Sequence, residues 1–303
     1  MSILRSSLVR VGIVAVCSSV ALEAQEPGAL VLRVPASPRA FGLGDAFVGG
    51  RGSDVVFYNP AQIRLVAGFF GTVTRYGGAS TQAAMASSTT LGKLTVAGFT
   101  QWLDHEADRF PARPGGLTET GQFHAQSLAL GGAAAIEIKG VRVGVAGKYV
   151  EDRHTVARGG VAAFDVGVGR QVDWLSVGLA VQHLGADLTA GTAAKLPTRV
   201  TLGGVTRPYP IGTFLDLSAA LSVSRERGGT IAPAGGLQLR YEPLAGWTVT
   251  ARAGARRVDG EGRPGLQPIT AGLSLGLDRL SVDYGFESYR GTGAAHRFGI
   301  RIE

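Results

Sequence analysis

The sequence is short of cysteine, of charge and of long apolar runs. Its single cysteine, Cys17, lies near the start of the 303 residues, so a chain shortened at that end has no thiol for a disulfide or a thiolate metal site. Beyond the first residues no run of about 18 apolar residues occurs, which excludes a bundle of transmembrane helices. Charged residues make up 17% of the chain and aromatic residues 7%, a composition that does not suit a helical soluble enzyme.

Basic residues exceed acidic ones but are not gathered into a binding surface. The formal net charge is +7, yet the lysines and arginines are scattered singly, without a basic run or interleaved aromatic residues. Nucleic-acid-binding proteins concentrate basic residues on one face or along one helix. We therefore predict no nucleic-acid partner and expect these charges to lie in loops and inside the fold.

The first residues have the layout of a secretory signal peptide. Two arginines precede an apolar stretch, 11–21, and small residues follow it. Cleavage after Ala21 and cleavage after Ala24 are both compatible with this pattern. We assign residues 1–24 to the signal peptide and expect the rest of the chain to be exported.

Glycine is abundant, with 46 residues, and from about residue 67 apolar and polar side chains alternate. The segments 214–224, 247–256 and 269–278 show the alternation most clearly. Successive side chains of a strand point to opposite faces, so each such strand has one apolar and one polar face. The pattern predicts an all-β protein, and the many glycines suit tight turns and close backbone packing.

Strand length separates the two architectures that use this pattern. A soluble β-sandwich buries its apolar faces between two sheets and has strands of about 5–6 residues. A membrane barrel turns its apolar faces to lipid and needs about 9–11 residues in each strand. The longer strands predicted here favour the barrel. The fourteen predicted strands are 67–76, 81–89, 93–103, 122–138, 140–150, 159–170, 174–184, 197–207, 211–223, 231–242, 245–256, 267–277, 279–288 and 295–302.

The connections between these strands alternate in length, with short ones after even-numbered strands and longer ones after most odd-numbered strands. The short connections are 139–140, 171–173, 208–210, 243–244 and 278–279; the longer ones are 104–121, 151–158, 185–196, 224–230, 257–266 and 289–294. Outer-membrane barrels have short periplasmic turns and longer outer loops. We therefore predict a transmembrane antiparallel up-and-down β-barrel of about 14 strands over residues 67–303, in contact with the lipid of the cell outer membrane.

The charged residues of the predicted strands fall on their polar faces. A lysine or arginine that faces lipid at the bilayer midplane costs about 2–4 kcal/mol, so the polar faces must point into the lumen. The expected lumen-facing charges are Arg142, Lys148, Asp165, Asp216, Arg240, Glu242, Arg252, Asp283, Glu287, Arg297 and Arg301.

Residues 25–66 depart from the alternation and precede the first strand. This stretch contains a glycine-rich run, 37–50, and a turn signal at Asn59-Pro60. Its size suits a small folded unit that plugs a barrel, so we predict an N-terminal hatch segment inside the lumen.

The same stretch carries a resemblance to a known family. An Arg-Ala-x-Gly-x-Gly-x-Ala-Phe-Val run followed by Tyr-Asn-Pro-Ala is similar to the PorV/PorQ group of FadL-like outer-membrane proteins. FadL-like barrels have 14 strands and an N-terminal hatch, so the resemblance implies the same fold. The matching residues are Arg39, Ala40, Gly42, Gly44, Ala46, Phe47, Val48, Tyr58, Asn59, Pro60 and Ala61.

The resemblance implies one of two activities. PorV-like members bind exported cargo proteins in the type IX secretion system, to which PorQ-like members also belong, whereas FadL-like members pass hydrophobic small molecules through the outer membrane. The predicted polar lumen favours a role in protein export or surface delivery, with cargo proteins or secretion-system components as partners. Transport of hydrophobic molecules is the alternative. The chain departs from many outer-membrane barrels by having Glu303, and not an aromatic residue, at its last position.

Three patterns resemble sites of chemistry but are better explained without it. Ser274 lies in a G-x-S-x-G match, but in mid-strand and not at the strand-to-helix turn that a nucleophile elbow needs. The acidic stretch 104–108 could bind calcium, but it lacks the glycine and ligand spacing of a calcium loop. The five histidines form no zinc-binding pair. We therefore predict no catalytic residue, no metal site and no cofactor, and an outer-membrane enzyme is the least favoured reading.

Overall fold

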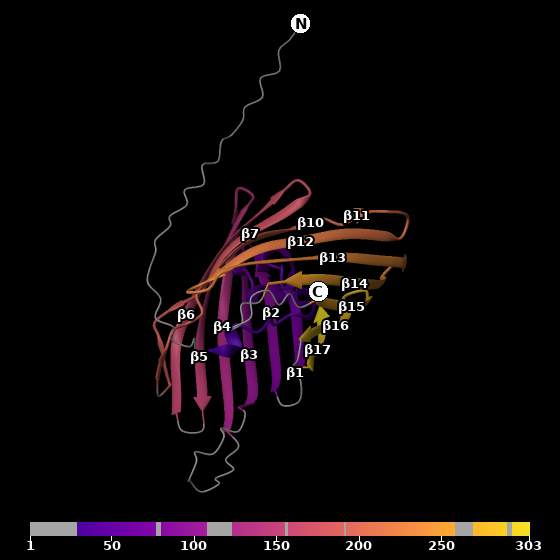
Figure 1. The fold of residues 1–303 in the computed structure, drawn as a ribbon. Coiled ribbons are helices and arrows are strands. Elements are labelled where there is room, and N and C mark those ends of the chain that lie inside the picture. Colours follow the sequence, from indigo (N-terminus) through magenta and orange to yellow (C-terminus); the bar gives the residue numbers. More distant parts are fainter. Residues whose placement is uncertain are drawn as a thin grey trace.

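The computed structural model describes residues 29–76, 80–107, 123–154, 157–190, 192–257, 269–289 and 293–303. The predicted signal peptide lies outside these residues. The described chain begins with short helical turns and continues as strands (Figure 1). The helical elements are η1 (Leu30–Leu32), α1 (Pro38–Gly42), η2 (Ser53–Phe57) and η3 (Pro60–Leu65). None of the helices in the described residues is long and apolar enough to cross a membrane.

Strands make up most of the described chain from residue 68 onward. They are β1 (Gly68–Tyr76), β2 (Ser80–Leu91), β3 (Leu94–Ala107), β4 (Phe123–Ile138), β5 (Val141–His154), β6 (Ala157–Val172), β7 (Leu175–Gly185), β8 (Leu188–Ala190), β9 (Thr192–Ala194), β10 (Arg199–Thr206), β11 (Tyr209–Pro210), β12 (Leu215–Glu226), β13 (Ile231–Leu244), β14 (Trp247–Arg256), β15 (Ile269–Leu277), β16 (Leu280–Tyr289) and β17 (Gly293–Ile302).

Fourteen of these strands close into one antiparallel barrel. Neighbours in sequence pair from β1 to β7 and from β12 to β17, and β10 joins β7 to β12. The pairing of β1 with β17 closes the ring, so the barrel has no free edge. The two-residue β11 pairs only with β12, and β8 and β9 form a separate hairpin. The predicted fold class, an all-β antiparallel barrel of 14 strands, is confirmed.

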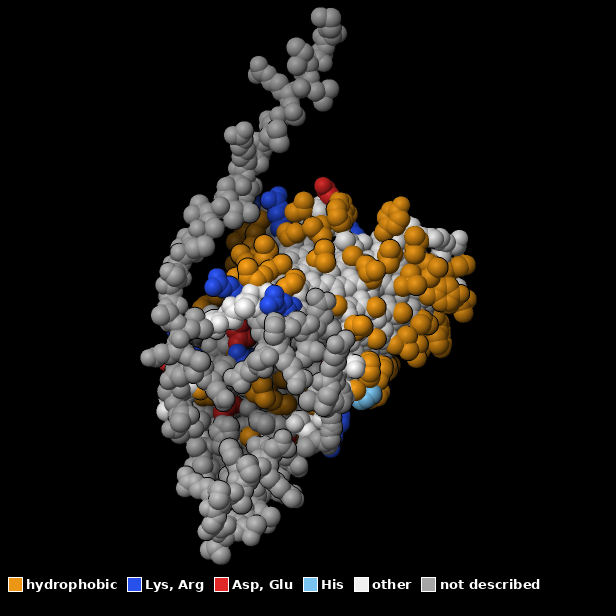
Figure 2. Space-filling view, in the orientation of Figure 1, with side chains coloured by type: hydrophobic (Ala, Val, Ile, Leu, Met, Phe, Trp, Pro, Cys, Tyr) orange, Lys and Arg blue, Asp and Glu red, His pale blue; other side chains and the backbone are white. Residues whose placement is uncertain are grey.

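The outer wall is apolar and the inner wall is mixed. Along β6, Phe164, Val166 and Val168 are exposed, whereas Ala163 and Asp165, which alternate with them, are buried. The space-filling view shows apolar side chains spread over the visible wall (Figure 2). Because successive side chains of a strand point to opposite faces, an apolar residue at every second position covers the outside with hydrocarbon. The positions between them face the interior.

Two expected loops are instead part of the sheet. β5 and β6 pair as far as His154 and Ala157, so most of the predicted loop 151–158 is strand. β3 runs to Ala107, so Asp104 lies in a strand and not in the outer loop predicted from residue 104. Backbone pairing continues beyond the apolar band because polar side chains at a barrel rim stay hydrated, so the end of the apolar alternation does not mark the end of a strand.

Two other connections also differ from the prediction: one is longer than expected, and one contains a hairpin. The expected short turn at 208–210 is part of a longer connection, since β12 begins only at Leu215. The loop predicted at 185–196 contains the β8–β9 hairpin, and β8 packs against β6. Residues 227–230 of the predicted loop 224–230 connect β12 to β13. Most of the predicted loops 104–121 and 257–266, and residues 290–292 of the loop 289–294, lie outside the described residues.

A ring of glycines on the inner wall accommodates residues 29–66, which we call the N-terminal segment. A Cβ atom at Gly254 of β14 would collide with the backbone of Gly44, and one at Gly144 of β5 would collide with the backbone of Ala61. These contacts place the segment against both sides of the barrel interior. The inner-wall glycines in contact with it are Gly144, Gly167, Gly169, Gly178, Gly204, Gly236, Gly254, Gly272, Gly285 and Gly299.

We expect Gly254→Ala to destabilise the folded barrel by at least about 1–3 kcal/mol, because the added methyl group overlaps backbone that cannot move aside. The matched control is Gly98→Ala on the outer face of β3, where a Cβ meets nothing within 4 Å. Urea unfolding monitored by a heat-modifiability gel measures both variants. Equal stability of the two variants would contradict the close packing described here.

Candidate functional site

The N-terminal segment crosses the interior of the barrel from wall to wall. α1 packs against β14, β15, β16 and β17, whereas η3 packs against β3, β4, β5 and β6. Figure 1 shows this indigo part of the chain enclosed by the strands. The segment and the inner wall around it therefore form the candidate functional site.

Local capping explains the polar residues at both ends of the segment. Ser37 caps α1, since its hydroxyl oxygen accepts hydrogen bonds from the backbone N–H groups of Arg39 at 3.1 Å and Ala40 at 3.3 Å. Asn59 caps η3 in the same way, and its side-chain oxygen accepts from Ala61 N at 3.0 Å. Pro60 follows Asn59 at the first helical position, where no N–H is needed.

The arginine of the family-like motif organises the segment internally. Arg39 forms two side-chain hydrogen bonds with Asp54, one of them at 3.2 Å, and its Nη2 donates to the carbonyl oxygen of Arg51 at 2.7 Å. Burial on its own would lower the pKa of the Arg39 guanidinium, but the charges of Asp54 and Glu303 outweigh it and hold that pKa above its usual value. Arg39 thus stays charged in a place where Asp54 is fully buried.

The aromatic residues of the motif pack beneath this ion pair. The Arg39 guanidinium lies 5.2 Å from the ring centre of Phe47, and the Phe47 and Tyr58 rings meet edge to face at 5.6 Å. The Tyr58 hydroxyl accepts from the backbone N–H groups of Ala36 and Ser37. Burial, with a further contribution from the charge of Asp45, raises the pKa of Tyr58 well above its usual value, so the phenol stays neutral.

The two motif glycines lie where the segment meets the wall. Gly44 has φ +66°, and its N–H donates to Thr270 Oγ1 of β15 at 3.1 Å. Gly42 lies against Gly272, also of β15. A side chain at Gly44 would be strained in this conformation and would also overlap the carbonyl of Ala255.

Glu303 links the segment to the end of β17. Its Oε1 accepts from Ser53 N at 3.0 Å and lies 3.5 Å from Arg39 Nη2. Its Oε2 accepts from Arg301 Nη1 at 2.8 Å. The inward carboxylate at a position where many barrels have an aromatic residue therefore contacts the N-terminal segment.

A hydrogen-bonded chain continues from Arg301 across the inner wall. Arg301 Nε donates to Asp283 at 2.6 Å, and Asp283 accepts from the hydroxyl of Ser274. Ser274 in turn accepts from Arg252 Nη1 at 2.5 Å. The serine of the G-x-S-x-G match is thus a buried member of an ionic network, with an arginine and an aspartate as its partners.

A second buried network lies on the opposite wall. Lys148 Nζ donates to both carboxylate oxygens of Asp165, at 2.8 and 2.7 Å, and lies 2.8 Å from His183 Nδ1. The β6–β7 register shifts between Phe164 and Val166, so both Gln182 and His183 oppose Asp165. This bulge, with His183 at φ +61°, turns two successive side chains inward. Sequence alternation does not reveal it.

Arg297 is fully buried and is held by neutral groups. It donates to Thr74 Oγ1 at 2.6 Å, to the Tyr76 hydroxyl at 2.7 Å and to Gln82 Oε1 at 2.9 Å. Its guanidinium lies 4.4 Å from the ring centre of Phe41, a residue of α1. The segment therefore also contacts the inner wall through a cation–π interaction.

The other predicted lumen-facing charges differ in environment. Glu287 is buried and accepts from Arg256 at 2.9 Å, and Arg142 is buried near one end of β5. Asp216, Arg240 and Glu242 are only partly buried, because they lie near the start of β12 and the end of β13, at one end of the barrel.

The sequence pattern had indicated a polar interior, but the interior also contains apolar side chains. An apolar cluster combines inward residues of β3 to β6 with the loop that carries β8 and with η1. These residues come from connections and from inward positions between the charged ones, so a prediction based on charged residues leaves them out. The buried members are Ala29, Val31, Leu32, Leu103, Ala129, Val150, Ala163, Leu188 and Leu196.

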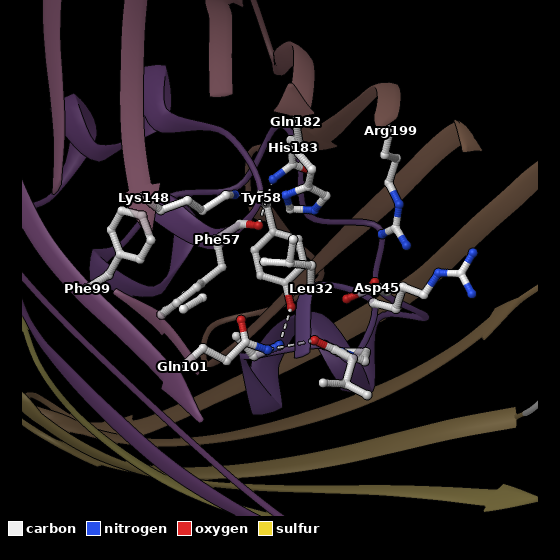
Figure 3. A pocket seen from close by; sticks show the side chains of 15 residues that line it. Leu32, Asp45, Phe57, Tyr58, Phe99, Gln101, Lys148, Gln182, His183 and Arg199 are labelled. Atoms are coloured by element: carbon white, nitrogen blue, oxygen red, sulfur yellow. Dashed lines mark hydrogen bonds between the residues drawn. The ribbon is translucent and has the colours of Figure 1, made fainter. Parts of the chain in front are cut away.

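A small cavity lies between the segment and the wall (Figure 3). Phe57 and Phe99 line one side of it, and Arg199 and Asp45 lie on the other. The volume open to water is about 30 Å³, whereas a cavity that binds benzene has about 150 Å³. In this state the cavity is large enough for about two water molecules and too small for an aromatic ring.

Metal ligation has no support in the described part of the chain, which contains no group of three or more His, Cys, Asp or Glu side chains arranged to hold a metal ion. Of the predicted acidic stretch 104–108, Asp104 lies in β3, and residue 108 lies outside the described residues.

The fold is shared with solved β-barrel structures of low sequence identity. The chain is similar to a structure described as the CymD monoaromatic hydrocarbon channel, with 11% identity over 83% of this chain and 91% of that chain and a TM-score of 0.54. It is also similar to the deltaS2S3 mutant of the TodX monoaromatic hydrocarbon channel, with 11% identity, 82% and 92% coverage and a TM-score of 0.51. No protein-family model and no curated protein matches the sequence. At these identities the likeness defines the class of fold, a closed 14-stranded barrel of this type.

Proposed function

We propose that the protein is an outer-membrane channel for small hydrophobic molecules, closed in this state by its N-terminal segment. The observation that carries the proposal is the shared fold with two structures described as monoaromatic hydrocarbon channels. The apolar outer wall supports the membrane location, because exposed rows such as Phe164, Val166 and Val168 are stable only against lipid.

The apolar cluster of the interior supports a hydrophobic solute. The inward residues Leu103, Ala129, Val150 and Ala163 come from the four consecutive strands β3 to β6, and Val31 of η1 belongs to the same cluster. A hydrophobic molecule would replace contacts of this kind at little cost once the segment shifts. The small volume of the present cavity implies that such a shift precedes passage.

The test is the entry of toluene into vesicles whose outer leaflet is lipopolysaccharide, a layer that slows the passage of apolar molecules, with the purified barrel inserted. We expect faster entry than into the same vesicles without protein, and no matching gain for a polar sugar. Val150→Thr should slow toluene entry by at least about threefold, since it adds a hydroxyl to the apolar cluster. Val145→Thr on the outer face of the same strand is the control. Equal entry with and without protein would refute the proposal.

A second candidate function is the export role implied by the family-like motif. Its support is that three residues of the motif, Arg39, Phe47 and Tyr58, form one packed unit within the segment. Loss of surface-delivered proteins in a deletion strain, with hydrocarbon entry unaffected, would favour this role over the channel.

A further inference from the structure

A charged cluster lies on the lipid-facing side of β5 and β6, just beyond the apolar band. The outward row of β5 runs through Val143, Val145 and Tyr149, all exposed, and then reaches Glu151 and Arg153. The presence of a carboxylate in an outward row is unusual, because lipid offers it no partner.

Two arginines enclose this carboxylate. Arg153 Nε donates to Glu151 Oε1, and Arg158 Nη2, from β6, donates to Glu151 Oε2 at 2.8 Å. Arg153 and Arg158 are register partners across the two strands. The Glu151 side chain is only 5% exposed, whereas those of Arg153 and Arg158 are 54% and 64% exposed. The cluster therefore presents two guanidinium groups and carries a net charge of one positive unit.

The position of the cluster matches the boundary of the bilayer. Arg158 and Arg170 lie on the same outward face of β6, with Phe164, Val166 and Val168 between them. They are separated by about 40 Å along the strand at about 3.3 Å per residue, or about 30 Å across the membrane at a tilt of about 40°. This span equals the hydrocarbon thickness of a bilayer.

Tyr149 marks the interface next to the cluster. Its ring lies across the neighbouring strand, where a Cβ at Gly160 would collide with the Tyr149 hydroxyl. Tyrosine rings gather at the level of lipid headgroups. The β5–β6 connection is at the same end of the barrel as the long connection 108–122, the end that outer-membrane barrels turn to the cell exterior.

We infer that Arg153 and Arg158 bind the phosphate groups of lipid headgroups in the outer leaflet, with Glu151 as the residue that orients them. A guanidinium has five N–H donors, and Glu151 engages one nitrogen of each arginine. The remaining donors face the headgroup level, where two planar guanidinium groups suit phosphate oxygens. The inference rests on the outer-membrane location proposed above and not on transport.

The test uses the purified full barrel in detergent and measures retained lipid by native mass spectrometry. The wild type is expected to retain bisphosphorylated lipid A, and Arg153→Gln/Arg158→Gln is expected to retain it at least about tenfold less. Arg170→Gln is the matched control, on the same face of β6 at the opposite membrane boundary, and should behave as wild type. The dephosphorylated form of lipid A should not be retained.

A second variant tests whether loss of the lipid results from misfolding. The double variant leaves Glu151 without a partner, so Glu151→Gln/Arg153→Gln/Arg158→Gln removes all three charges together and should fold and still lose the lipid. Full retention by either folded variant would overturn the inference. So would equal loss in Arg170→Gln, equal retention of the dephosphorylated lipid, or displacement of the lipid by millimolar inorganic phosphate. Failure of toluene entry alone would leave this result unchanged and refute only the channel.

Discussion

A barrel that lacks residues 30–65 should conduct ions at least about tenfold better than the full chain, because a 14-stranded barrel is wider than the eight-stranded barrels that side chains can fill. In the full chain the segment packs against both walls, and the cavity beside it has a volume of about 30 Å³. Conductance in planar bilayers measures the change.

The truncated chain must first be shown to fold, which a heat-modifiability gel establishes. Gly98→Ala in the full chain is the control for conductance, since it alters only the outer wall. A folded truncated barrel that conducts no better than the full chain would mean that something other than the segment closes the pore.

Asp54→Ala should lower the free energy of unfolding by about 3–5 kcal/mol, the cost of removing one partner from a buried ion pair. Asp54 is fully buried and accepts hydrogen bonds from Arg39 and Ser37. Its removal leaves the Arg39 guanidinium beside the carboxylate of Glu303 alone, at 3.5 Å. Urea unfolding of the purified barrel gives the value.

Asp187→Ala is the control for this variant, because Asp187 is exposed. Its effect should stay within about 0.5 kcal/mol. The double variant Arg39→Met/Asp54→Ala removes both charges and should recover part of the loss. An Asp54→Ala barrel as stable as the Asp187→Ala barrel would show that the ion pair does not support the segment.

The alternation of side chains, together with strand length and the alternating length of the connections, was sufficient to predict the barrel. Rows such as Phe164, Val166 and Val168 follow from a period of two, and a closed ring is the arrangement that lets every such strand face lipid on one side. The same alternation placed Lys148 and Arg297 on the inner wall, where both are buried. These are local properties, so a single sequence reveals them.

The partners of these charges were beyond prediction. Lys148 contacts His183 because a bulge in β7 brings two successive residues inward. Arg297 lies over Phe41, more than 250 positions away in the chain, because α1 crosses the interior. Contacts of this kind depend on register and on the path of the N-terminal segment, and neither leaves a periodic trace in the sequence.

The glycines show most clearly which features the sequence determines and which the tertiary structure decides. Their abundance indicated tight turns and close backbone packing, but not where that packing occurs. Many glycines, Gly144 and Gly254 among them, lie in mid-strand and make room for the backbone of the N-terminal segment. By itself the sequence determined a barrel with an apolar outside and charged residues inside, since those features depend on neighbouring residues. The sequence predicted a hatch segment in the lumen, but only the tertiary structure decided how closely that segment packs against both walls, because close packing is settled by which backbone atoms meet once the ring has closed.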